Sequence, residues 1–307
     1  MTGTQRTRGE TPALPPGTSL APGVLPPGRL LGIDAGGSAT RVAVAEGGQV
    51  VSWSETTPMN ALLTPDVPDR LAELALAAGA AAVGVGLPGI RTEVAGAELA
   101  ALVGARCGCR VSVVPDAEVA RLGAFLGEPG VIVAAGTGSV AVGWDGVRTA
   151  RAGGHGYLFG DDGGAYWIGR EAARSVLRWQ DGAGGSPALA AAILDAVGGD
   201  AEDLVRHAHR HPGDRSLLAG LAPVITALAG TDDEAARISR EAAGHLAALA
   251  STVCRRLGPL PVAGVGGVLA AAPVWGPFAA ASGAGRPMAP PAVGALLLAA
   301  RTHEELR

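Results

Sequence analysis

The chain contains no lysine and is poor in several other residue types. Its 24 basic residues are all arginines, and its 307 residues include one asparagine, five tryptophans, two tyrosines and three phenylalanines. A Walker-type phosphate loop ends in Gly-Lys-Ser/Thr, a Schiff base needs a lysine amine, and protein kinases use a lysine on a strand. The absence of lysine therefore excludes these three chemistries.

Cysteine is also scarce. The three cysteines, Cys107, Cys109 and Cys254, cannot form a disulfide framework, and no His/Cys pair at zinc spacing accompanies the first two. We interpret them as reduced thiols, with a structural metal site as the less favoured alternative. Reduced thiols indicate a cytoplasmic location.

Long apolar runs and an excess of positive charge are missing as well. No stretch approaches the roughly 18 uninterrupted apolar residues of a membrane span, and a Pro/Gly-rich run replaces the apolar segment of a secretory signal. The net charge is −4, whereas nucleic-acid binding calls for clustered positive charge. The sequence predicts a protein that binds neither membranes nor nucleic acids.

A repeated order of elements predicts two α/β domains. Each repeat opens with a buried apolar strand, at 30–33 and at 131–135, followed by a turn of small residues and a hairpin. Two such units facing each other would form a cleft, where ligands commonly bind. The predicted boundaries are 1–28 for a disordered tail rich in Pro and Gly, 29–128 for the first domain, 129–290 for the second, and 291–307 for a final helix packed on the first domain.

The turn after the first strand has the composition of an anion-binding loop. Glycines let backbone N–H groups approach an anion closely, and hydroxyl side chains add further donors. Asp34 ends the strand, where its carboxylate could hold Mg²⁺ through a water. An ordinary hairpin turn with a surface acid is the alternative. The residues expected to contact a nucleotide here are Asp34, Gly36, Gly37, Ser38 and Thr40.

The second repeat carries a turn of the same design. Gly136, Thr137, Gly138 and Ser139 directly follow the apolar strand of that repeat. One such turn is commonplace. Two such turns, each at the start of an equivalent unit, are expected to contact a phosphate chain from both sides. The sequence therefore predicts a nucleotide site.

A third glycine turn lies near the C-terminus. An apolar strand at 260–265 runs into Gly266 and Gly267. Close backbone approach at these glycines would suit a flat adenine ring, and a tight strand-to-helix connection is the alternative.

Asp116 lies between the two phosphate-type turns in the sequence, where a strand ends and a helix begins. The structural interpretation is an N-cap, which stabilises a helix by about 1 kcal/mol. The functional interpretation is a general base that takes the proton of an attacking hydroxyl. The two interpretations are compatible.

The segment 153–169 is the most unusual in the chain. It carries seven glycines, the paired acids Asp161 and Asp162, and four of the few aromatic residues. Carboxylates in this setting could bind the hydroxyls of a sugar, and His155 could stack on it or hydrogen-bond to it. A packed domain-junction loop is the alternative.

Together these motifs resemble the BadF/BadG/BcrA/BcrD ATPase family, which includes N-acetylglucosamine kinase, within the actin/hexokinase/Hsp70 superfamily. The resemblance implies two ribonuclease-H-like, actin-like ATPase domains flanking a nucleotide cleft, with ATP and Mg²⁺ as cofactors. The matching motifs are the first phosphate motif at 34–38, the second at 135–139, the adenosine motif at 266–268, and an amino-sugar kinase motif at 153–163 with 166–169.

The resemblance also implies roles for single residues. Asp116 would be the catalytic base, and Asp161 would bind sugar hydroxyls. Asn60, the only asparagine, falls in the loop where the family places a sugar-contacting Asn, and Gly154 and His155 belong to the sugar motif. The implied activity is phosphorylation of an amino sugar, most simply N-acetylglucosamine or glucosamine, by a protein that could be a homodimer.

Three positions depart from the family pattern and leave alternatives open. Ala39 stands where the family often carries Lys, His155 where Trp is common, and Val140 where kinases that recognise the N-acetyl group often show Asn. Glucose or a related sugar is therefore an alternative acceptor. An ATPase of the dehydratase-activator type and a non-catalytic nucleotide- or sugar-binding regulator are the alternative functions.

Overall fold

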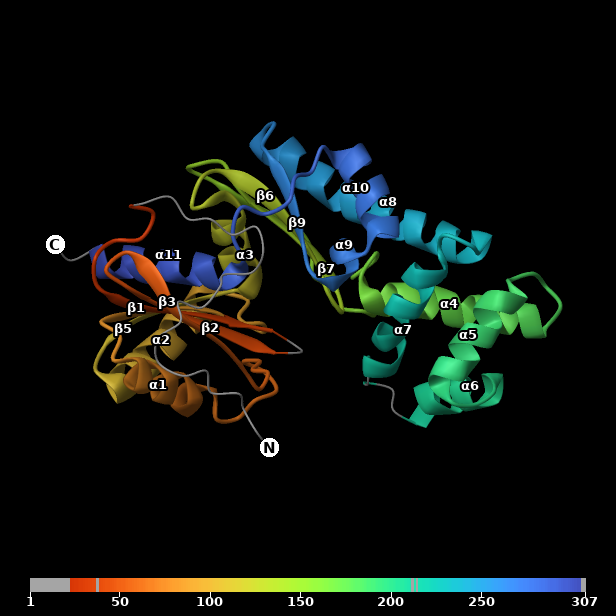
Figure 1. Ribbon diagram of the computed structural model, residues 1–307, viewed down its shortest axis with the longest axis horizontal. Helices are drawn as coiled ribbons and strands as arrows, with labels where there is room; N and C mark the ends of the chain where they lie inside the picture. Colours follow the sequence, from red (N-terminus) through yellow and green to blue (C-terminus); the bar gives the residue numbers. More distant parts are fainter. Residues whose placement is uncertain (1–22, 37–38, 211–212, 214, 305–307) are drawn as a thin grey trace. The chain divides into compact units, whose positions relative to one another are not determined.

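The computed structural model describes residues 23–36, 39–210, 213 and 215–304, and these form two compact units (Figure 1). One unit comprises the described residues up to Glu128 together with those from Pro287 onward, and the other comprises Pro129–Arg286. Each unit contains one mixed β-sheet with helices packed on it. This arrangement confirms the predicted α/β class.

The first unit is built on a five-stranded sheet in the order β3-β2-β1-β4-β5. β1 (Arg29–Ala35), β2 (Thr40–Glu46) and β3 (Gln49–Thr56) form an antiparallel meander. β4 (Ala82–Gly86) pairs parallel with β1, and β5 (Arg110–Val114) pairs parallel with β4. Because parallel strands end at the same edge of a sheet, the residues that follow β1, β4 and β5 share one edge.

Helices pack on both faces of this sheet. Along β1, Leu31 belongs to the cluster formed with α1 and α2, whereas Leu30 belongs to the cluster formed with α11. Gly84 of β4 is needed for the close approach of α11, since a Cβ there would lie 2.1 Å from the Ala295 carbonyl oxygen. The helices of this unit are α1 (Val67–Ala78), α2 (Glu93–Cys107), α3 (Asp116–Phe125) and α11 (Pro291–Glu304).

Most of the predicted N-terminal tail, 1–22, lies outside the described residues. Among 23–28, Leu25 is only 2% exposed and packs in the same cluster as Leu30 and the buried face of α11. The packed part of the chain thus begins before Arg29, because Leu25 fills a site at the sheet although prolines and glycines surround it in the sequence.

The second unit contains a four-stranded sheet in the order β8-β7-β6-β9. β6 (Gly130–Ala135), β7 (Ser139–Trp144) and β8 (Thr149–Gly153) are antiparallel, and β9 (Val262–Val265) pairs parallel with β6. The second sheet therefore repeats the strand-turn-hairpin order of the first, as the sequence predicts.

Helices make up most of the rest of the second unit. They are α4 (Ala165–Gln180), α5 (Pro187–Val197), α6 (Ala201–Arg210), α7 (Ser216–Leu228), α8 (Asp233–Leu257), α9 (Gly267–Ala270) and α10 (Ala272–Ser282). The sequence analysis did not predict α9 and α10. In the described part of the chain, no helix has both the length and the apolar character needed to cross a membrane.

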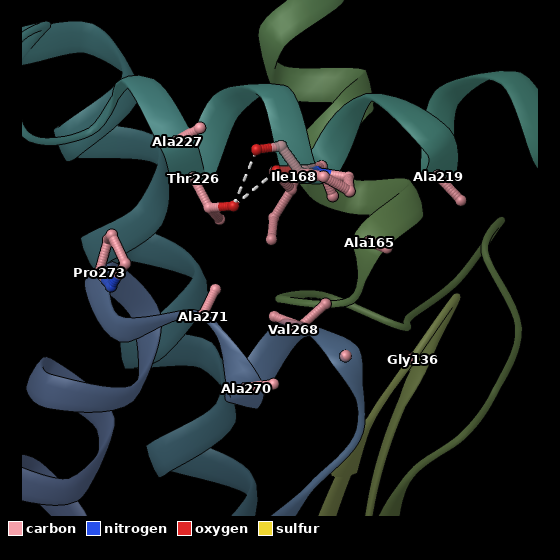
Figure 2. A pocket seen from close by; sticks show the side chains of 13 residues that line it. Gly136, Ala165, Ile168, Ala219, Thr226, Ala227, Val268, Ala270, Ala271 and Pro273 are labelled. Carbon is pink, nitrogen blue, oxygen red and sulfur yellow. Dashed lines mark hydrogen bonds between the residues drawn. The ribbon is translucent and has the colours of Figure 1, made fainter.

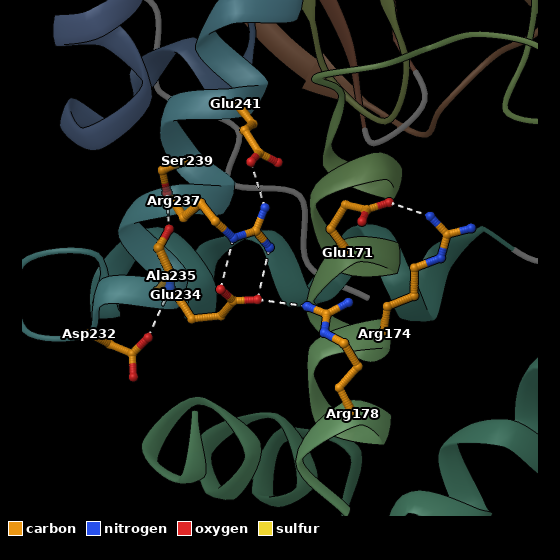
Figure 3. Close-up of polar contacts among 9 residues, drawn as sticks. All are labelled: Glu171, Arg174, Arg178, Asp232, Glu234, Ala235, Arg237, Ser239 and Glu241. Carbon is orange, nitrogen blue, oxygen red and sulfur yellow. Dashed lines mark hydrogen bonds and ion pairs between the residues drawn. The ribbon is translucent and has the colours of Figure 1, made fainter. Parts of the chain in front are cut away.

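An ion-pair network joins α8 to α4 (Figure 3). The Glu234 carboxylate accepts hydrogen bonds from Arg237, one turn along α8, and from Arg178 of α4, which lies 2.8 Å away. These contacts, led by the Arg237 hydrogen bond, lower the pKa of Glu234 to about 2. At the start of α8, the Asp232 side chain accepts a hydrogen bond from the Ala235 N–H and caps the helix.

Candidate functional site

Two acidic residues meet at the carboxyl edge of the first sheet. Asp34, near the end of β1, is 8% exposed. Burial raises the pKa of Asp34 from 3.8 to about 7; the Arg41 guanidinium opposes this increase, and the Asp116 carboxylate adds to it. The two carboxylates therefore repel each other, and burial additionally disfavours the ionised form of Asp34. A bound cation would offset both the repulsion and the effect of burial.

Asp116 is the first residue of α3, and Pro115 occupies the N-cap position. Its Oδ1 accepts a hydrogen bond from the Ala117 N–H at 2.9 Å. The carboxylate thus lies in the first helical turn, where the helix dipole favours a negative charge. The interpretation of Asp116 as an N-cap is wrong by one position, because the fixed φ of Pro115 ends the extended segment before it.

The surroundings of Asp34 fit a hydrated Mg²⁺. Among the described residues there is no cluster of three or more His, Cys, Asp or Glu side chains that could enclose a metal. Mg²⁺, however, usually keeps several waters and takes only one or two carboxylates. The Thr40 side chain is fully buried, and its Oγ1 has no hydrogen-bond partner among the described residues, so it is a further polar atom near the end of β1.

The first phosphate-type turn is only partly described. Gly37 and Ser38 lie outside the described residues. The Gly36 N–H donates to the Ala39 carbonyl oxygen at 3.0 Å and closes the turn. Of the donors predicted in this loop, the Gly36 N–H is therefore already engaged within the protein.

The second phosphate-type turn is fixed to the start of α4. The Ala165 N–H donates to the Gly136 carbonyl oxygen at 2.8 Å, and the Tyr166 N–H donates to the Thr137 carbonyl oxygen at 3.1 Å. Ser139 is buried, and its hydroxyl donates to the Asp162 carbonyl oxygen at 2.7 Å. Gly136 and Thr137 are exposed, so these two residues are the ones that can meet a phosphate.

Asp161 lies against this same turn. It is 7% exposed and adopts a φ of 61°, which is uncommon for a residue with a side chain. A Cβ added at Gly138 would lie 2.3 Å from Asp161 Oδ2, and the Ser139 N–H points toward Asp161 Oδ1 at 3.5 Å. Gly138 therefore makes room for the buried carboxylate, and Asp161 supports the turn from within.

The remainder of the predicted sugar motif forms a loop anchored on β7. The Gly154 N–H donates to the Ser139 carbonyl oxygen at 2.9 Å, and Gly154 has a φ of 69° that favours glycine. His155 follows it and is exposed. Further along, the Tyr157 ring packs edge-on against a second tyrosine ring at 5.1 Å, and Phe159 is 87% exposed. The base of the loop is thus fixed, while its aromatic tip faces solvent.

Asn60 lies in the first unit, in the loop after β3. Its Oδ1 accepts from the Leu62 N–H at 2.8 Å, which is an Asx-turn, and its own N–H donates to Thr64 Oγ1 at 3.1 Å. Gly89 packs on this turn, because a Cβ there would lie 2.9 Å from Asn60 Oδ1. The carboxamide oxygen is therefore structural, and the carboxamide nitrogen is the part that could reach a substrate.

A cavity of about 560 Å³ lies inside the second unit (Figure 2). Its walls are almost entirely small and apolar, and Thr226 donates its hydroxyl to the carbonyl oxygens of Ala222 and Pro223, both at 3.1 Å. This volume falls in the range of small-molecule sites, about 300–1,000 Å³. The lining residues are Gly136, Ala165, Ile168, Ala219, Ala222, Pro223, Thr226, Ala227, Gly267, Val268, Ala270, Ala271 and Pro273.

This cavity brings together two motifs that lie far apart in the sequence. Gly136 of the second phosphate-type turn and Gly267 of the C-terminal glycine turn both line it. Gly266 does not line it; its φ is 100°, and a Cβ would lie 2.3 Å from the Ala135 carbonyl oxygen. The contribution of α7 was missed, and Pro223 inside an apolar helix was the only available signal for it.

Comparisons with known proteins agree with this architecture. Over 140 residues the chain is 36% identical to an N-acetylmuramic acid/N-acetylglucosamine kinase of Clostridium acetobutylicum. This match covers 45% of this chain and 46% of that relative, so it spans about half the length of the relative. A crystal structure of a candidate N-acetylglucosamine kinase from Chromobacterium violaceum is 30% identical, with a TM-score of 0.73 over 89% of this chain and 99% of its own.

A more distant structure shows how far the fold extends. A ROK family glucokinase from Streptomyces griseus, solved with glucose and AMPPNP, has a TM-score of 0.59 at 18% identity, over 89% of this chain and 97% of its own. This likeness confirms the actin-like ATPase fold that the motifs predicted. The model of the BadF/BadG/BcrA/BcrD ATPase family matches residues 31–299. The chain therefore belongs to the BadF/BadG/BcrA/BcrD ATPase family.

Proposed function

We propose that this protein is an ATP-dependent carbohydrate kinase that phosphorylates a hydroxyl of an amino sugar. One observation carries the proposal: Asp34 on β1 and Asp116 just after β5 lie at the same edge of one sheet and interact electrostatically, near the buried, unpartnered hydroxyl of Thr40. Such a pair can divide the work of metal positioning and proton transfer. The named kinase relatives support the same reaction class.

In this proposal the adenine ring occupies the apolar cavity beside Gly267, and Gly136 and Thr137 contact the phosphates. Asp34 would hold Mg²⁺ through a water, and its carboxylate would be ionised when the cation is bound. Bound Mg²⁺ supplies electrostatic stabilisation of the charge that develops on the phosphoryl oxygens. Asp116 accepts the proton of the sugar hydroxyl as that oxygen attacks the γ-phosphorus.

Polar groups of the predicted sugar motifs supply the contacts to the sugar. We assign contacts to the Asn60 carboxamide nitrogen, to the Gly154 backbone and to the His155 side chain. Asp161 contributes by fixing the turn that carries Thr137, since its carboxylate is buried against Gly138. N-acetylglucosamine and glucosamine are the first candidate acceptors, followed by N-acetylmuramic acid because of the relative from C. acetobutylicum. A homodimer and a cytoplasmic location stay predictions.

The test is ADP release from MgATP with a panel of sugars and without sugar. Asp116→Asn should lower turnover by about 10²–10⁴-fold, the usual contribution of a general base, while ATP binding measured by calorimetry is retained. Asp233→Asn is a matched control, because Asp233 is also the first residue of a helix and is exposed.

Each outcome separates the candidate functions. Sugar-dependent ADP release that is lost in Asp116→Asn, with a sugar phosphate identified by mass spectrometry, would establish the kinase and its acceptor. ADP release that is equal with and without sugar would refute the kinase and indicate an ATPase that serves a protein partner. Loss of ATP binding together with turnover in Asp116→Asn would refute the assignment of the base.

A further inference from the structure

A pair of cysteines outside the proposed active site lies in near-bonding contact. Cys107 is the last residue of α2, and Cys109 immediately precedes β5. Gly108, between them, has a φ of 69° and ends the helix in the left-handed conformation. This sharp reversal places the two Sγ atoms 3.0 Å apart, in a thiol–thiol hydrogen bond.

Small reagents can reach this pair. Both side chains are half-buried, and Gly108 is exposed. Cys109 also lines a groove of about 750 Å³ along α2 and β5, whose walls on the α2 side are glycines and alanines. An oxidant of the size of a small peptide can therefore approach the sulfurs without local unfolding.

We propose that Cys107 and Cys109 form a redox modification site that converts reversibly to an intrachain disulfide when a low-molecular-weight disulfide acts as oxidant. A disulfide has an S–S distance of about 2.05 Å, so the sulfurs need to approach by only about 1 Å. Side-chain rotation alone can provide a movement of this size, and the adjacent left-handed glycine already turns the backbone.

The surroundings of the two sulfurs determine which one attacks the oxidant first and which one then closes the disulfide. Burial and the hydrogen bond with Cys107 raise the pKa of Cys109 above its ordinary value, so Cys109 favours the protonated thiol. Cys107 is then the sulfur that attacks the oxidant as a thiolate, since the thiolate is the nucleophile.

The exchange balances without any other reactant. Attack by the Cys107 thiolate breaks the S–S bond of the oxidant, forms a mixed disulfide and releases one thiolate. Cys109 then attacks Sγ of Cys107, its proton passes to the departing sulfur, and a second small thiol leaves. The protein thiols are oxidised by two electrons, and one small disulfide is reduced to two thiols.

We expect the disulfide to be labile. Its ring encloses a single intervening residue, so it removes little entropy from the unfolded chain. Strained and exposed disulfides are the ones that thiols reduce readily. The pair therefore acts as a reversible site and not as a structural cross-link.

The experiment treats the full chain with glutathione disulfide, alkylates the remaining thiols and measures intact mass and peptide masses. Three thiols are present before treatment. We expect one alkylated thiol afterwards, at Cys254, with no retained glutathione and full reversal by dithiothreitol. Cys109→Ser should retain glutathione on Cys107, and Cys107→Ser should resist modification at Cys109. Circular dichroism checks that each variant is folded.

Two results would overturn the proposal. One is a glutathione adduct that persists on the wild-type pair, which would mean that Cys109 cannot resolve it. The other is continued alkylation of all three thiols, or reaction first at Cys254, which lies on α8 and serves as an internal reference. Cys254→Ser should leave the exchange unchanged.

Discussion

Asp34 should make the folded protein less stable as the pH rises, and Asp34→Asn should remove this dependence. The carboxyl group is 8% exposed, and its pKa is raised from 3.8 to about 7 by burial first of all. Burying an ionised carboxylate without a bound cation destabilises the folded protein, and residues with such shifted pKa values are concentrated at functional sites. Asn has nearly the same shape but carries no charge, so the variant isolates the cost of ionisation.

The sign follows from proton linkage. Between pH 4 and 7 the folded state binds a proton at Asp34 that the unfolded chain has released, so the free energy of unfolding decreases as the pH rises. This contribution is fully present below about pH 4 and is lost as the pH passes about 7. Each pH unit is worth about 1.4 kcal/mol, so the pKa range of 3.8 to about 7 corresponds to about 4 kcal/mol at most.

The assay is urea denaturation of wild type and Asp34→Asn at pH 5 and pH 8, followed by the fluorescence of Trp53, the only tryptophan of the first unit. About two pH units separate pH 5 from the folded-state pKa of about 7, so we expect Asp34→Asn to gain about 3 kcal/mol relative to wild type between pH 5 and pH 8. Mg²⁺ should stabilise wild type at pH 8 more than it stabilises the variant. Parallel pH profiles for the two proteins would refute the burial of a titrating Asp34.

Two variant pairs test packing in the second unit. Gly266→Ala places a Cβ 2.3 Å from the Ala135 carbonyl oxygen at a φ of 100° and should lower stability by about 2 kcal/mol or more. The control Gly276→Ala meets no atom within 4 Å and should leave the melting temperature unchanged or raise it. Equal melting temperatures would contradict the close approach. Glu234→Gln should cost about 1 kcal/mol in urea denaturation and Arg174→Ala less than half as much, because Arg174 is 58% exposed; equal losses would contradict a linking role for Glu234.

Local patterns predicted most of the fold. The strands around the two hairpins follow from apolar runs bounded by small-residue turns, and most helices follow from apolar periodicity with a glycine or an N-cap at their ends. α9 and α10 were missed because glycines and prolines punctuate their sequence. Pro273 occupies the first turn of α10, where proline is compatible with a helix, and Pro277 lies inside it. Tertiary packing, with Phe278 fully buried, outweighs that local preference.

Motifs located the candidate site but could not show which donors are engaged. The hydroxyl of Ser139 and the N–H of Gly36 both look available in the sequence, yet each bonds to a backbone carbonyl oxygen inside the protein. The sequence likewise could not show that the Asp161 carboxylate is buried against Gly138. The contacts of Ser139 and Asp161 join segments more than 20 residues apart, and no local pattern encodes them.

The glycine pair at the end of β9 shows why composition alone cannot separate fold from function. Gly266 is required by the chain itself, because its φ is positive and backbone atoms of β6 occupy the place of a Cβ. Its neighbour Gly267 has no atom within 4 Å of that place and lines the apolar cavity. A methyl group at Gly267 would therefore meet no protein atom within 4 Å and leave the fold intact. Two identical residues in one motif thus serve different ends, one structural and one open to a ligand.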